Sequence, residues 1–304
     1  MKSPGKKLRE LINAPDILVM PGIFDGYSAR LVEKHAYSAG FITGAGISEC
    51  RLGQADVGLM GMEDNLGACR AIVACCNLPM IADGDTGYGN AVNVYHMVRA
   101  FEQAGLGGLM VEDQQWPKRC GHMKGKQVIS AEENAEKIRA AADARRDPDF
   151  IIKSRTDAYA THGLKEAIRR LNLYAEAGAD LLFADAVLKE EDIATTVRNV
   201  SKPVSVNMGF GIRSRSTTPQ ITAQRLQELG VAAVIYPRLL TSCAIRGMTN
   251  GLDALREMLD TGKIEDRADL AASFDEINDL VGLPAVQQLE QRYLSKEELR
   301  SKYG

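Results

Sequence analysis

Three stretches of the sequence repeat one pattern: QAGLGGLMVE at residues 103–112, EAGADLLFAD at 176–185 and ELGVAAVIYP at 228–237. In each stretch a helical pattern ends at a glycine, and an apolar, strand-like run follows. We interpret these glycines as residues that terminate helices, because glycine adopts the left-handed backbone conformation at little cost. They are Gly105, Gly178 and Gly230, and the residues seven positions later, which end the strands, are Glu112, Asp185 and Pro237. The repeat therefore predicts that helix, turn and buried strand recur as one unit.

Eight apolar runs in the chain have the length of a buried strand, and each is followed by a polar turn and a helical pattern. They lie at residues 17–20, 38–43, 79–83, 107–112, 150–154, 180–184, 203–207 and 232–236. Continuous apolar strands that alternate with helices indicate a parallel sheet covered on both faces. Eight such units within roughly 240 residues predict an α/β fold of the (β/α)8 TIM barrel type. A doubly wound open sheet is the alternative.

The pattern changes after the eighth unit. We expect residues 1–261 to form the catalytic barrel domain and residues 262–304 to form a C-terminal helical extension. Two helical stretches, 264–281 and 285–303, are separated by the sequence GLP at 282–284. They are too short to form an independent domain, so we expect them to pack on the barrel or on a neighbouring subunit.

The composition is that of an ordinary soluble protein, with 45% apolar and 25% charged residues. A net charge of −3 gives no basic field, so we expect no nucleic-acid partner. No apolar run has the length of a membrane span, and the first residues, MKSPGKKLRELINAPD, indicate a short amphipathic helix rather than a signal region. The six cysteines form neither a disulfide framework nor a paired CxxC zinc pattern, which favours a reducing, cytoplasmic location.

Barrel enzymes carry their active sites at the C-terminal ends of the strands, and polar or small residues occupy those ends in this chain. They are Thr43, Gly44, Ala45, Asp83, Asp85, Glu112, Arg155, Asp157, Asp185 and Asn207. A single carboxylate at a strand end is more often a helix N-cap than a ligand. Several carboxylates that converge on one small opening repel each other unless a cation lies among them. The gathering therefore indicates a cation site.

The motif DGDTGYG at residues 83–89 is the clearest part of that site. Asp83 and Asp85 leave a buried strand on the same side, and the glycines let the backbone approach a ligand. Oxygen ligands without histidine suit Mg²⁺, with Mn²⁺ as a possible substitute, better than zinc. We expect Asp56 and Glu112 to belong to the same site, either directly or through metal-bound water.

The stretch EDQQWPKRCGHMKGK, which begins at Glu112, places a thiol among cations. Cys120 follows Lys118 and Arg119 directly and lies two positions before His122. Neighbouring cations favour the thiolate form of a cysteine, so the stretch predicts a nucleophile or a proton donor and an anionic substrate. The alternative is a surface cysteine in a solvated basic loop.

Four motifs, in this order along the chain, resemble those of the isocitrate lyase/phosphoenolpyruvate mutase superfamily. They are TGAG at 43–46, DGDTGYG at 83–89, KRCGH at 118–122 and SRTDA at 154–158, and the resemblance extends over roughly residues 5–260. The resemblance implies a Mg²⁺-dependent barrel that acts on a small acid. It also implies a homotetramer in which a C-terminal helix is exchanged between paired subunits.

The resemblance further implies a role for each residue of the site. Metal binding falls to Asp83 and Asp85, with Asp56 and Glu112 in the water shell of the metal. Substrate binding falls to Thr43, Gly44, Ala45, Gly121, Arg155, Asp185, Asn207 and Pro237. Catalysis falls to Cys120 as the general acid, with Lys118, Arg119 and His122 stabilising the developing anion. The planar guanidinium of Arg155 suits two-point binding of a substrate carboxylate.

A few positions narrow the choice within the superfamily. Cys120 favours the carbon–carbon lyases over the phosphonate mutases, and its surroundings are most similar to the group of 2,3-dimethylmalate lyase, oxaloacetate hydrolase and petal death protein. Ser242 stands where methylisocitrate lyases carry an arginine for a third carboxylate, which favours a dicarboxylate. Pro237 and Arg238 stand where oxaloacetate hydrolases have a serine, which favours a lyase. Asp185 replaces the glutamate usual in relatives, and its shorter side chain leaves room for a substrate methyl group or changes how the neighbouring arginine is held.

We therefore expect retro-Claisen-type cleavage of a 2-hydroxy dicarboxylate, with cleavage of 2,3-dimethylmalate to pyruvate and propionate as the best candidate. Hydrolysis of oxaloacetate to oxalate and acetate, and cleavage of methylisocitrate, are alternatives on the same scaffold. A metal-free aldolase would instead use a lysine on a strand, such as Lys153. A non-enzymatic binder of small acids, or a redox sensor, would need Cys120 but no turnover.

Overall fold

The computed structural model describes residues 2–121, 123–213 and 217–303. The chain divides into two compact units, Met1–Ser242 and Cys243–Gly304. The division falls inside a long helix, α11 (Leu239–Thr261), whereas the sequence pattern places the domain boundary after residue 261.

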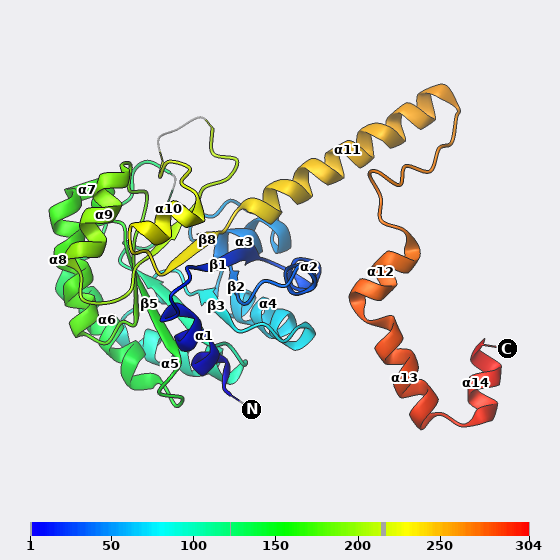
Figure 1. Cartoon of the computed structure of the whole chain (residues 1–304), viewed down its shortest axis with the longest axis horizontal. Coiled ribbons are helices and arrows are strands. Elements are labelled where there is room, and N and C mark those ends of the chain that lie inside the picture. Colours follow the sequence, from blue (N-terminus) through cyan, green and yellow to red (C-terminus); the bar gives the residue numbers. More distant parts are fainter. Residues whose placement is uncertain (1, 122, 214–216, 304) are drawn as a thin grey trace. The chain divides into compact units, whose positions relative to one another are not determined.

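Eight parallel strands form the centre of the first unit (Figure 1). Their bounds are β1 Leu18–Ile23, β2 Gly40–Ile42, β3 Met80–Asp83, β4 Gly108–Glu112, β5 Ile151–Thr156, β6 Leu181–Ala184, β7 Ser205–Asn207 and β8 Ala233–Tyr236. The strand order is β6-β5-β4-β3-β2-β1-β8-β7. A parallel bridge between Leu182 and Val204 joins β6 to the residue before β7. The sheet is therefore a nearly closed (β/α)8 barrel, which confirms the expected fold over the open, doubly wound alternative.

Each of the eight expected strands is present, and two of them extend beyond the predicted run. β1 continues to Ile23 and β5 to Thr156, because backbone pairing with the neighbouring strands does not require apolar side chains. β1 also approaches the segment after β8 closely. A Cβ atom at Gly22 would lie 2.4 Å from the carbonyl oxygen of Pro237, so only glycine fits there. This close approach fixes the place of the residues that follow β8.

Helices surround the barrel (Figure 1). Those of the first unit before α11 are α1 Pro4–Ile12, α2 Gly26–Lys34, α3 Gly44–Arg51, α4 Met62–Cys75, α5 Ala91–Gln103, α6 Ala131–Ala144, α7 Ala158–His162, α8 Leu164–Glu176, α9 Glu190–Asn199 and α10 Ala223–Glu228. Gly105, Gly178 and Gly230 have φ angles of 97°, 113° and 84° and directly follow the C-caps of α5, α8 and α10. This left-handed conformation confirms that the three glycines terminate helices.

The N-terminal helix α1 closes one end of the barrel. Ser3 caps it by accepting a hydrogen bond from the N–H of Lys6 at 3.1 Å, and its apolar face buries Leu8 and Ile12, as the amphipathic pattern predicts. Both side chains belong to the apolar cluster that fills the barrel interior. A Cβ atom at Gly107, just before β4, would lie 2.6 Å from Leu8. The helix therefore seals the N-terminal ends of the strands, and the opposite end carries the cavity described below.

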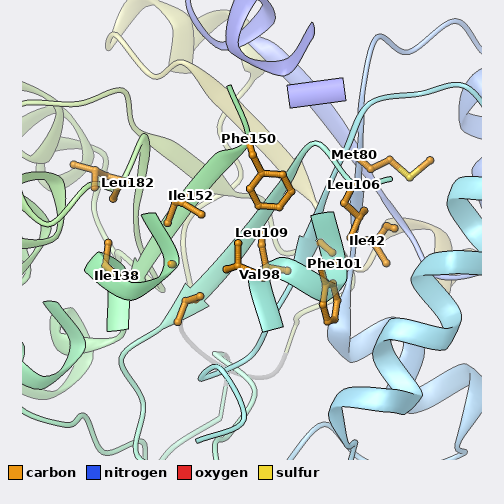
Figure 2. Packing of buried hydrophobic residues seen from close by; sticks show 14 of the residues in the cluster. Ile42, Met80, Val98, Phe101, Leu106, Leu109, Ile138, Phe150, Ile152 and Leu182 are labelled. Carbon is orange, nitrogen blue, oxygen red and sulfur yellow. The ribbon is translucent and has the colours of Figure 1, made fainter. Parts of the chain in front are cut away.

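A larger apolar cluster lies between the strands and the surrounding helices. Figure 2 shows Leu109 and Ile152 of the sheet close to Val98, Phe101 and Ile138 of the helices. Burial of an apolar side chain of this size contributes roughly 1.5–3 kcal/mol. This layer therefore keeps the strand ends, and the polar residues on them, in fixed positions.

The second unit contains most of α11 and three shorter helices, α12 Phe274–Val281, α13 Leu283–Tyr293 and α14 Lys296–Tyr303. The expectation of two helices beyond residue 262 is wrong. Ser273 and Glu276 form a reciprocal capping box at the start of α12, and Ser295 and Glu298 exchange equivalent hydrogen bonds at the start of α14. These caps begin new helices inside both predicted stretches. Gly282, with φ of 86°, ends α12, as the GLP sequence predicts.

One face of α11 carries exposed apolar side chains. Ile245, Met248, Leu252, Leu255 and Leu259 are 51–72% exposed, and their spacing of three and four residues places them on the same side of the helix. Within the described part of the chain, no helix combines the length and the apolar character that crossing a membrane requires.

Candidate active site

A small cavity of about 40 Å³ lies at the C-terminal ends of the barrel strands. Most of the residues singled out in the sequence line it: Thr43, Ala45, Asp56, Asp83, Lys118, Cys120, Gly121, Arg155, Asp185, Asn207 and Pro237. Phe41, Met110 and Arg238 line it as well. Strand ends that are far apart in the sequence therefore bring carboxylates, cations and the thiol to one place.

The remaining members of the predicted set lie elsewhere. Gly44, Asp85 and Glu112 are buried next to residues of the cavity wall without being part of its lining. Arg119 is exposed, and the side chain of Gln114 holds its backbone through bonds to its N–H and its carbonyl oxygen, both at 2.9 Å. The structure thus places the Arg119 side chain outside the cavity. His122 lies outside the described residues.

The turn expected to bind a carboxylate opens helix α3. The hydroxyl of Thr43 caps this helix by accepting the N–H of Gly46 at 3.3 Å. The first N–H groups of a helix have no partner within the helix, and the helix dipole adds partial positive charge, so this end favours an anion. A Cβ atom at Gly44 would lie 3.0 Å from Oδ2 of Asp83. Glycine therefore lets the turn lie directly against the first carboxylate of the DGD motif.

Lys118 ties the loop between β4 and α6, the β4–α6 loop, to the carboxylates expected to bind metal. Its ammonium forms ion pairs with Asp56 and with Asp85, the latter at 2.8 Å, and all three side chains are buried. The N–H of Cys120 donates to the carbonyl oxygen of Asp56 at 3.1 Å. Residue 56 therefore holds the thiol-bearing loop through both its side chain and its backbone.

The charges around Lys118 are strongly coupled. Burial raises the pKa of Asp85 to about 6; Lys118 opposes this shift, and the charges of Asp83 and Asp56 add to it. Burial lowers the pKa of Lys118, but Asp85 and Asp56 outweigh burial and raise it. Burial also raises the pKa of Glu112 well above its usual range. Carboxylates whose ionised forms are disfavoured in this way are stabilised by an added cation.

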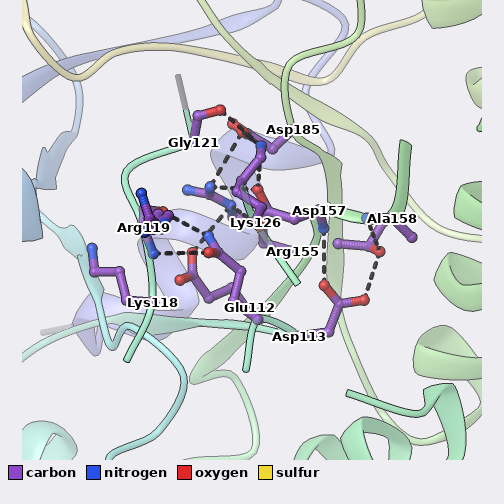
Figure 3. A network of polar contacts seen from close by, with 12 residues as sticks. Glu112, Asp113, Lys118, Arg119, Gly121, Lys126, Arg155, Asp157, Ala158 and Asp185 are labelled. Atoms are coloured by element: carbon purple, nitrogen blue, oxygen red, sulfur yellow. Dashed lines mark hydrogen bonds and ion pairs between the residues drawn. The ribbon is translucent and has the colours of Figure 1, made fainter. Parts of the chain in front are cut away.

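Arg155, at the end of β5, lies in a buried network of carboxylates (Figure 3). Its Nε and Nη2 atoms donate to the two carboxylate oxygens of Asp157, both at 2.9 Å. The same guanidinium contacts Glu112 and Asp185, each at 3.2 Å. The two-point pairing expected with a substrate carboxylate is thus made with Asp157, while the Arg155 side chain still lines the cavity.

Lys126 connects the far end of the β4–α6 loop to the same network. Its ammonium donates to Asp157 at 2.7 Å and to Asp185 at 3.1 Å. It also donates to the carbonyl oxygen of Gly121 at 2.7 Å. A Cβ atom at Gly121 would lie 2.1 Å from Oδ2 of Asp185, so glycine lets the loop lie against this acid. Gly121 therefore allows the loop to pass close to Asp185 at the position next to Cys120.

Asp113 supports the network from outside the barrel and was not singled out from the sequence. It is fully buried and accepts hydrogen bonds from Thr156 at 2.6 Å and from Arg170 and Tyr174 at 2.9 Å. It also accepts the N–H of Asp157 at 2.9 Å. A buried carboxylate that accepts this many hydrogen bonds holds its neighbours in place. Asp113 therefore fixes the position of the Asp157 backbone.

Lys153 lies inside the barrel between two aromatic rings. Its Nζ atom is 4.9 Å from the ring centre of Phe41 and 4.7 Å from that of Phe183. This nitrogen is buried and has no hydrogen-bond partner among the described residues, and burial lowers the pKa of Lys153 to about 7. The side chain is not part of the cavity lining. The geometry therefore does not favour a Schiff-base aldolase built on Lys153.

The donors at the cavity suit Mg²⁺ better than a metal that needs a full protein cage. In the described residues, no three side chains of His, Cys, Asp or Glu are grouped so as to hold a metal ion. Mg²⁺ is commonly bound through only one or two carboxylates and keeps several water ligands. Asp83 lines the cavity, and Oε1 of the buried Glu112 has no hydrogen-bond partner in the described part of the chain. One or two of these carboxylates, with water completing the coordination, would fit Mg²⁺.

Comparison with known proteins agrees with this arrangement. A family model described as phosphoenolpyruvate phosphomutase matches residues 8–256. The chain belongs to this family, the PEP mutase/isocitrate lyase superfamily. The superfamily resemblance of the four motifs is thereby confirmed.

Several relatives of the chain have named activities. A 2,3-dimethylmalate lyase of Eubacterium barkeri is 39% identical over 287 residues, which cover 94% of this chain and 97% of the relative. The petal death protein of Dianthus caryophyllus is 37% identical and covers 96% of this chain and 90% of its own length. Among solved structures, an oxaloacetate acetylhydrolase in complex with 3,3-difluorooxalacetate matches with a TM-score of 0.89 and 29% identity, covering 97% of this chain and 98% of that one. A 2,3-dimethylmalate lyase structure matches with a TM-score of 0.88 and 28% identity over 97% of both chains.

Sequence reasoning missed two features of this superfamily member. The first is Arg238, which lines the cavity. From the sequence, Arg238 indicated only that the serine of oxaloacetate hydrolases is absent. Its position directly after Pro237, at the end of a strand, was the signal that could have identified it. The second feature is the charge pairing around Arg155. The sequence marks Asp157 only as a strand-end residue and does not mark Lys126, yet both join this network, because no sequence spacing indicates which charges pair.

Proposed function

We propose that this superfamily member is a carbon–carbon lyase that cleaves a 2-hydroxy dicarboxylate, with 2,3-dimethylmalate, cleaved to pyruvate and propionate, as the first candidate. The observation that carries the proposal is that Cys120 lines the same small cavity as Asp83 and the Thr43 turn. A proton donor, a cation-binding carboxylate and an anion-binding helix end thus face one small cavity. The relatives named as lyases support this reaction class.

In the proposed reaction, the turn from Thr43 to Ala45 binds the carboxylate next to the reacting carbon. Mg²⁺, when bound at Asp83, supplies a Lewis acid that stabilises negative charge on the substrate 2-oxygen and carboxylate. A base takes the 2-hydroxyl proton, the C2–O bond becomes a carbonyl, and the C2–C3 bond breaks with its electron pair remaining on C3. The products at this stage are a 2-keto acid and a carbanion conjugated with its own carboxylate.

Cys120 then gives its proton to C3, which completes the second product as a simple carboxylic acid. Lys118 lies beside the metal-binding carboxylates and Asn207 lines the cavity, so we assign both to stabilising the anion before it is protonated. Arg155 orients the substrate from within its network of acids. Arg119, which lies outside the cavity, is a weaker candidate for this role than the sequence suggested.

The β4–α6 loop must move for substrate to enter. A cavity of about 40 Å³ has room for a few water molecules, since one needs roughly 10–15 Å³, but not for a branched dicarboxylate. Lys118, Cys120 and Lys126 all bond the loop to the barrel. We propose that this is the closed arrangement, and that it keeps water away from the carbanion during proton transfer.

A pyruvate-coupled assay tests the proposal. Purified protein with Mg²⁺ or Mn²⁺ should release pyruvate from 2,3-dimethylmalate, and excess EDTA should abolish the release. Methylisocitrate and oxaloacetate in parallel assays address the alternatives, of which oxaloacetate hydrolysis is supported by the similarity to an oxaloacetate acetylhydrolase structure. Absence of turnover on all three acids would leave a small-acid binder or a redox sensor as the better description.

We also propose that the C-terminal region, residues 262–304 together with α11, mediates assembly into a homotetramer. The exposed apolar side chains of α11 line up on one face of the helix, a pattern that marks protein–protein contacts, and a second copy of the chain is the partner we assign to this face. Light scattering on the purified protein measures the mass directly. Leu252→Glu and Leu259→Glu should shift the mass towards the monomer, whereas a monomeric parent protein would contradict the assembly. We also propose a cytoplasmic location, because the spacing of the six cysteines shows no disulfide framework.

A further inference from the structure

Of the cations that line the cavity, Arg238 contacts the fewest carboxylates among the described residues. Lys118 contacts two carboxylates and Arg155 contacts three. Among the described residues, Arg238 forms one ion pair, from Nη2 to Oε1 of Glu49 at 2.6 Å, and both side chains are 26% exposed. A guanidinium carries five N–H donors, so one carboxylate oxygen satisfies only part of its capacity.

The position of Arg238 is fixed from both sides. Its main chain follows Pro237, whose carbonyl oxygen lies so close to β1 that only Gly22 fits beside it. The hydroxyl of Thr241 donates to the carbonyl oxygen of Arg238 at 3.0 Å. Glu49 then holds the guanidinium itself. The arginine is thus held in place by both its backbone and its side chain.

Glu49 belongs to α3, the helix whose N-terminal turn we assign to a substrate carboxylate. α3 runs from Gly44 to Arg51, with the Thr43 turn at its N-terminus and Glu49 in its last turn. One short helix therefore presents an anion-binding turn to the cavity and positions a guanidinium on the same cavity. Burial lowers the pKa of Arg238, but Glu49 and the nearby Cys120 and Asp56 outweigh burial and raise it, so the guanidinium stays charged beside the thiol.

We infer that Arg238 binds the second carboxylate of the substrate, on the fragment that Cys120 protonates, and that Glu49 is its positioning residue. The inference rests on the proposed lyase function and makes it more specific: the substrate class is a dicarboxylate whose two carboxylates lie at the Thr43 turn and at Arg238. The guanidinium also stabilises the charge that develops on the departing fragment, because that fragment's carboxylate receives electron density from C3 when the C2–C3 bond breaks.

Calorimetric binding of two probes in the presence of Mg²⁺ separates this role from general damage to the site. Pyruvate carries one carboxylate and probes the Thr43 turn, whereas 2-methylmalate carries two and probes both ends. Measurements in a Cys120→Ser background prevent consumption of 2-methylmalate. Arg238→Ala should weaken 2-methylmalate roughly 10- to 100-fold, as expected for lost hydrogen bonds to a charged group, and change pyruvate affinity less than about 3-fold.

Further variants define the two roles. Arg238→Lys should recover part of the affinity for 2-methylmalate, because it restores the charge without the planar fork. Glu49→Ala should weaken 2-methylmalate less than Arg238→Ala does and leave pyruvate unchanged, and Glu49→Gln, which keeps an acceptor oxygen, should lie closer to the parent. Arg70→Ala, an exposed arginine on α4, is the matched control. Melting temperatures and circular dichroism establish that each variant folds.

The outcomes are distinguishable. Equal affinity of the parent and a folded Arg238→Ala variant for 2-methylmalate would overturn the inference while leaving the lyase proposal intact. Equal losses for pyruvate and 2-methylmalate would also overturn it, because they would show that Arg238 shapes the whole cavity. If the parent protein binds neither probe and cleaves no dicarboxylate, the proposed function fails and the inference fails with it.

Discussion

Arg155 and Asp157 are paired through two parallel hydrogen bonds, Nε to Oδ2 and Nη2 to Oδ1, both at 2.9 Å. Both residues come from the same strand end, and both are buried. Arg155 also contacts Glu112 and Asp185, each at the longer distance of 3.2 Å. The orientation of its guanidinium towards the cavity therefore depends mainly on the two-point contact with Asp157. The residue that orients the cavity-lining guanidinium is therefore an acid two positions further along the chain.

Asp157→Asn tests this dependence. The amide cannot balance the charges of Arg155 and Lys126, and breaking a buried ion pair from one side costs about 3–5 kcal/mol. We expect the free energy of unfolding, from urea titration, to fall by about that amount. Glu190→Gln, which removes the partly exposed partner of the exposed Arg225, is the matched control and should change stability by less than about 1 kcal/mol. A similar small change in both variants would mean that Asp157 is not holding Arg155.

The pH dependence of stability should report on Lys153. Its pKa in the folded protein is lowered to about 7 by burial, so between about pH 7 and pH 10 the unfolded chain binds a proton that the folded protein has lost. The free energy of unfolding should therefore rise with pH across that window, by on the order of 1 kcal/mol per pH unit. Below pH 7 Lys153 is protonated in both states, so its contribution should no longer change with pH.

Lys153→Met removes that slope. Urea titrations from pH 6 to pH 10 should show the variant more stable than the parent at the acidic end, with the difference shrinking as the pH rises. Lys165→Met, at an exposed position, should leave the parent's slope unchanged. Parallel pH profiles for the parent and Lys153→Met would show that the buried amine stays protonated.

The positions of the strands follow from the sequence because each buried strand needs a continuous apolar run. Thr43, Asp83 and Arg155 reach one cavity for the same reason, since the ends of parallel barrel strands meet at one face. The charge pairing could not be predicted in this way. Lys118 pairs with Asp56 and Asp85 only because the β4–α6 loop folds back over the barrel.

The misplaced expectations have local causes. Arg119 lies exposed on the loop, whose backbone Gln114 holds through the N–H and the carbonyl oxygen of Arg119, and such bonds leave no periodic signal in the sequence. The C-terminal helices were expected to be longer because their apolar spacing continues across Ser273 and Ser295. There the hydrogen bonds of the caps, rather than apolar spacing, decide where a helix begins.

Asp83→Ala should weaken Mg²⁺ binding and abolish turnover, because it removes the carboxylate that lines the cavity beside the Thr43 turn. Isothermal titration with MgCl₂ measures the affinity directly and without substrate. Asp143→Ala, at an exposed position on α6, is the control and should bind Mg²⁺ as the parent does. Unchanged Mg²⁺ affinity in Asp83→Ala would remove Asp83 from the metal site.

Pro237→Ser should raise hydrolysis of oxaloacetate relative to lyase activity. Pro237 lines the cavity, and a hydroxyl there offers a hydrogen-bonding group that proline lacks. The readout is the ratio of oxalate formed from oxaloacetate to pyruvate formed from 2,3-dimethylmalate. Pro237→Ala controls for the loss of the ring, and an equal ratio in both variants would show that the hydroxyl does not select the reaction.

Cys120→Ser should lower kcat far more than it raises KM. Serine keeps the size and a hydroxyl but is a much weaker acid than a thiol with a pKa of about 8.5, so protonation of the departing carbanion slows. The expected loss in kcat is on the order of 10²–10⁴-fold, the range for removal of a general acid. KM should move little, because the Thr43 turn, Arg155 and Arg238 remain in the cavity.

Alkylation provides an independent measure of the same residue. Iodoacetamide should inactivate the parent protein, and substrate with Mg²⁺ should protect it by closing the β4–α6 loop over Cys120. Cys243→Ser is the matched control, since Cys243 is an exposed free cysteine outside the cavity, and this variant should keep full activity and remain sensitive to the reagent. A kcat for Cys120→Ser within a few-fold of the parent would show that another group delivers the proton.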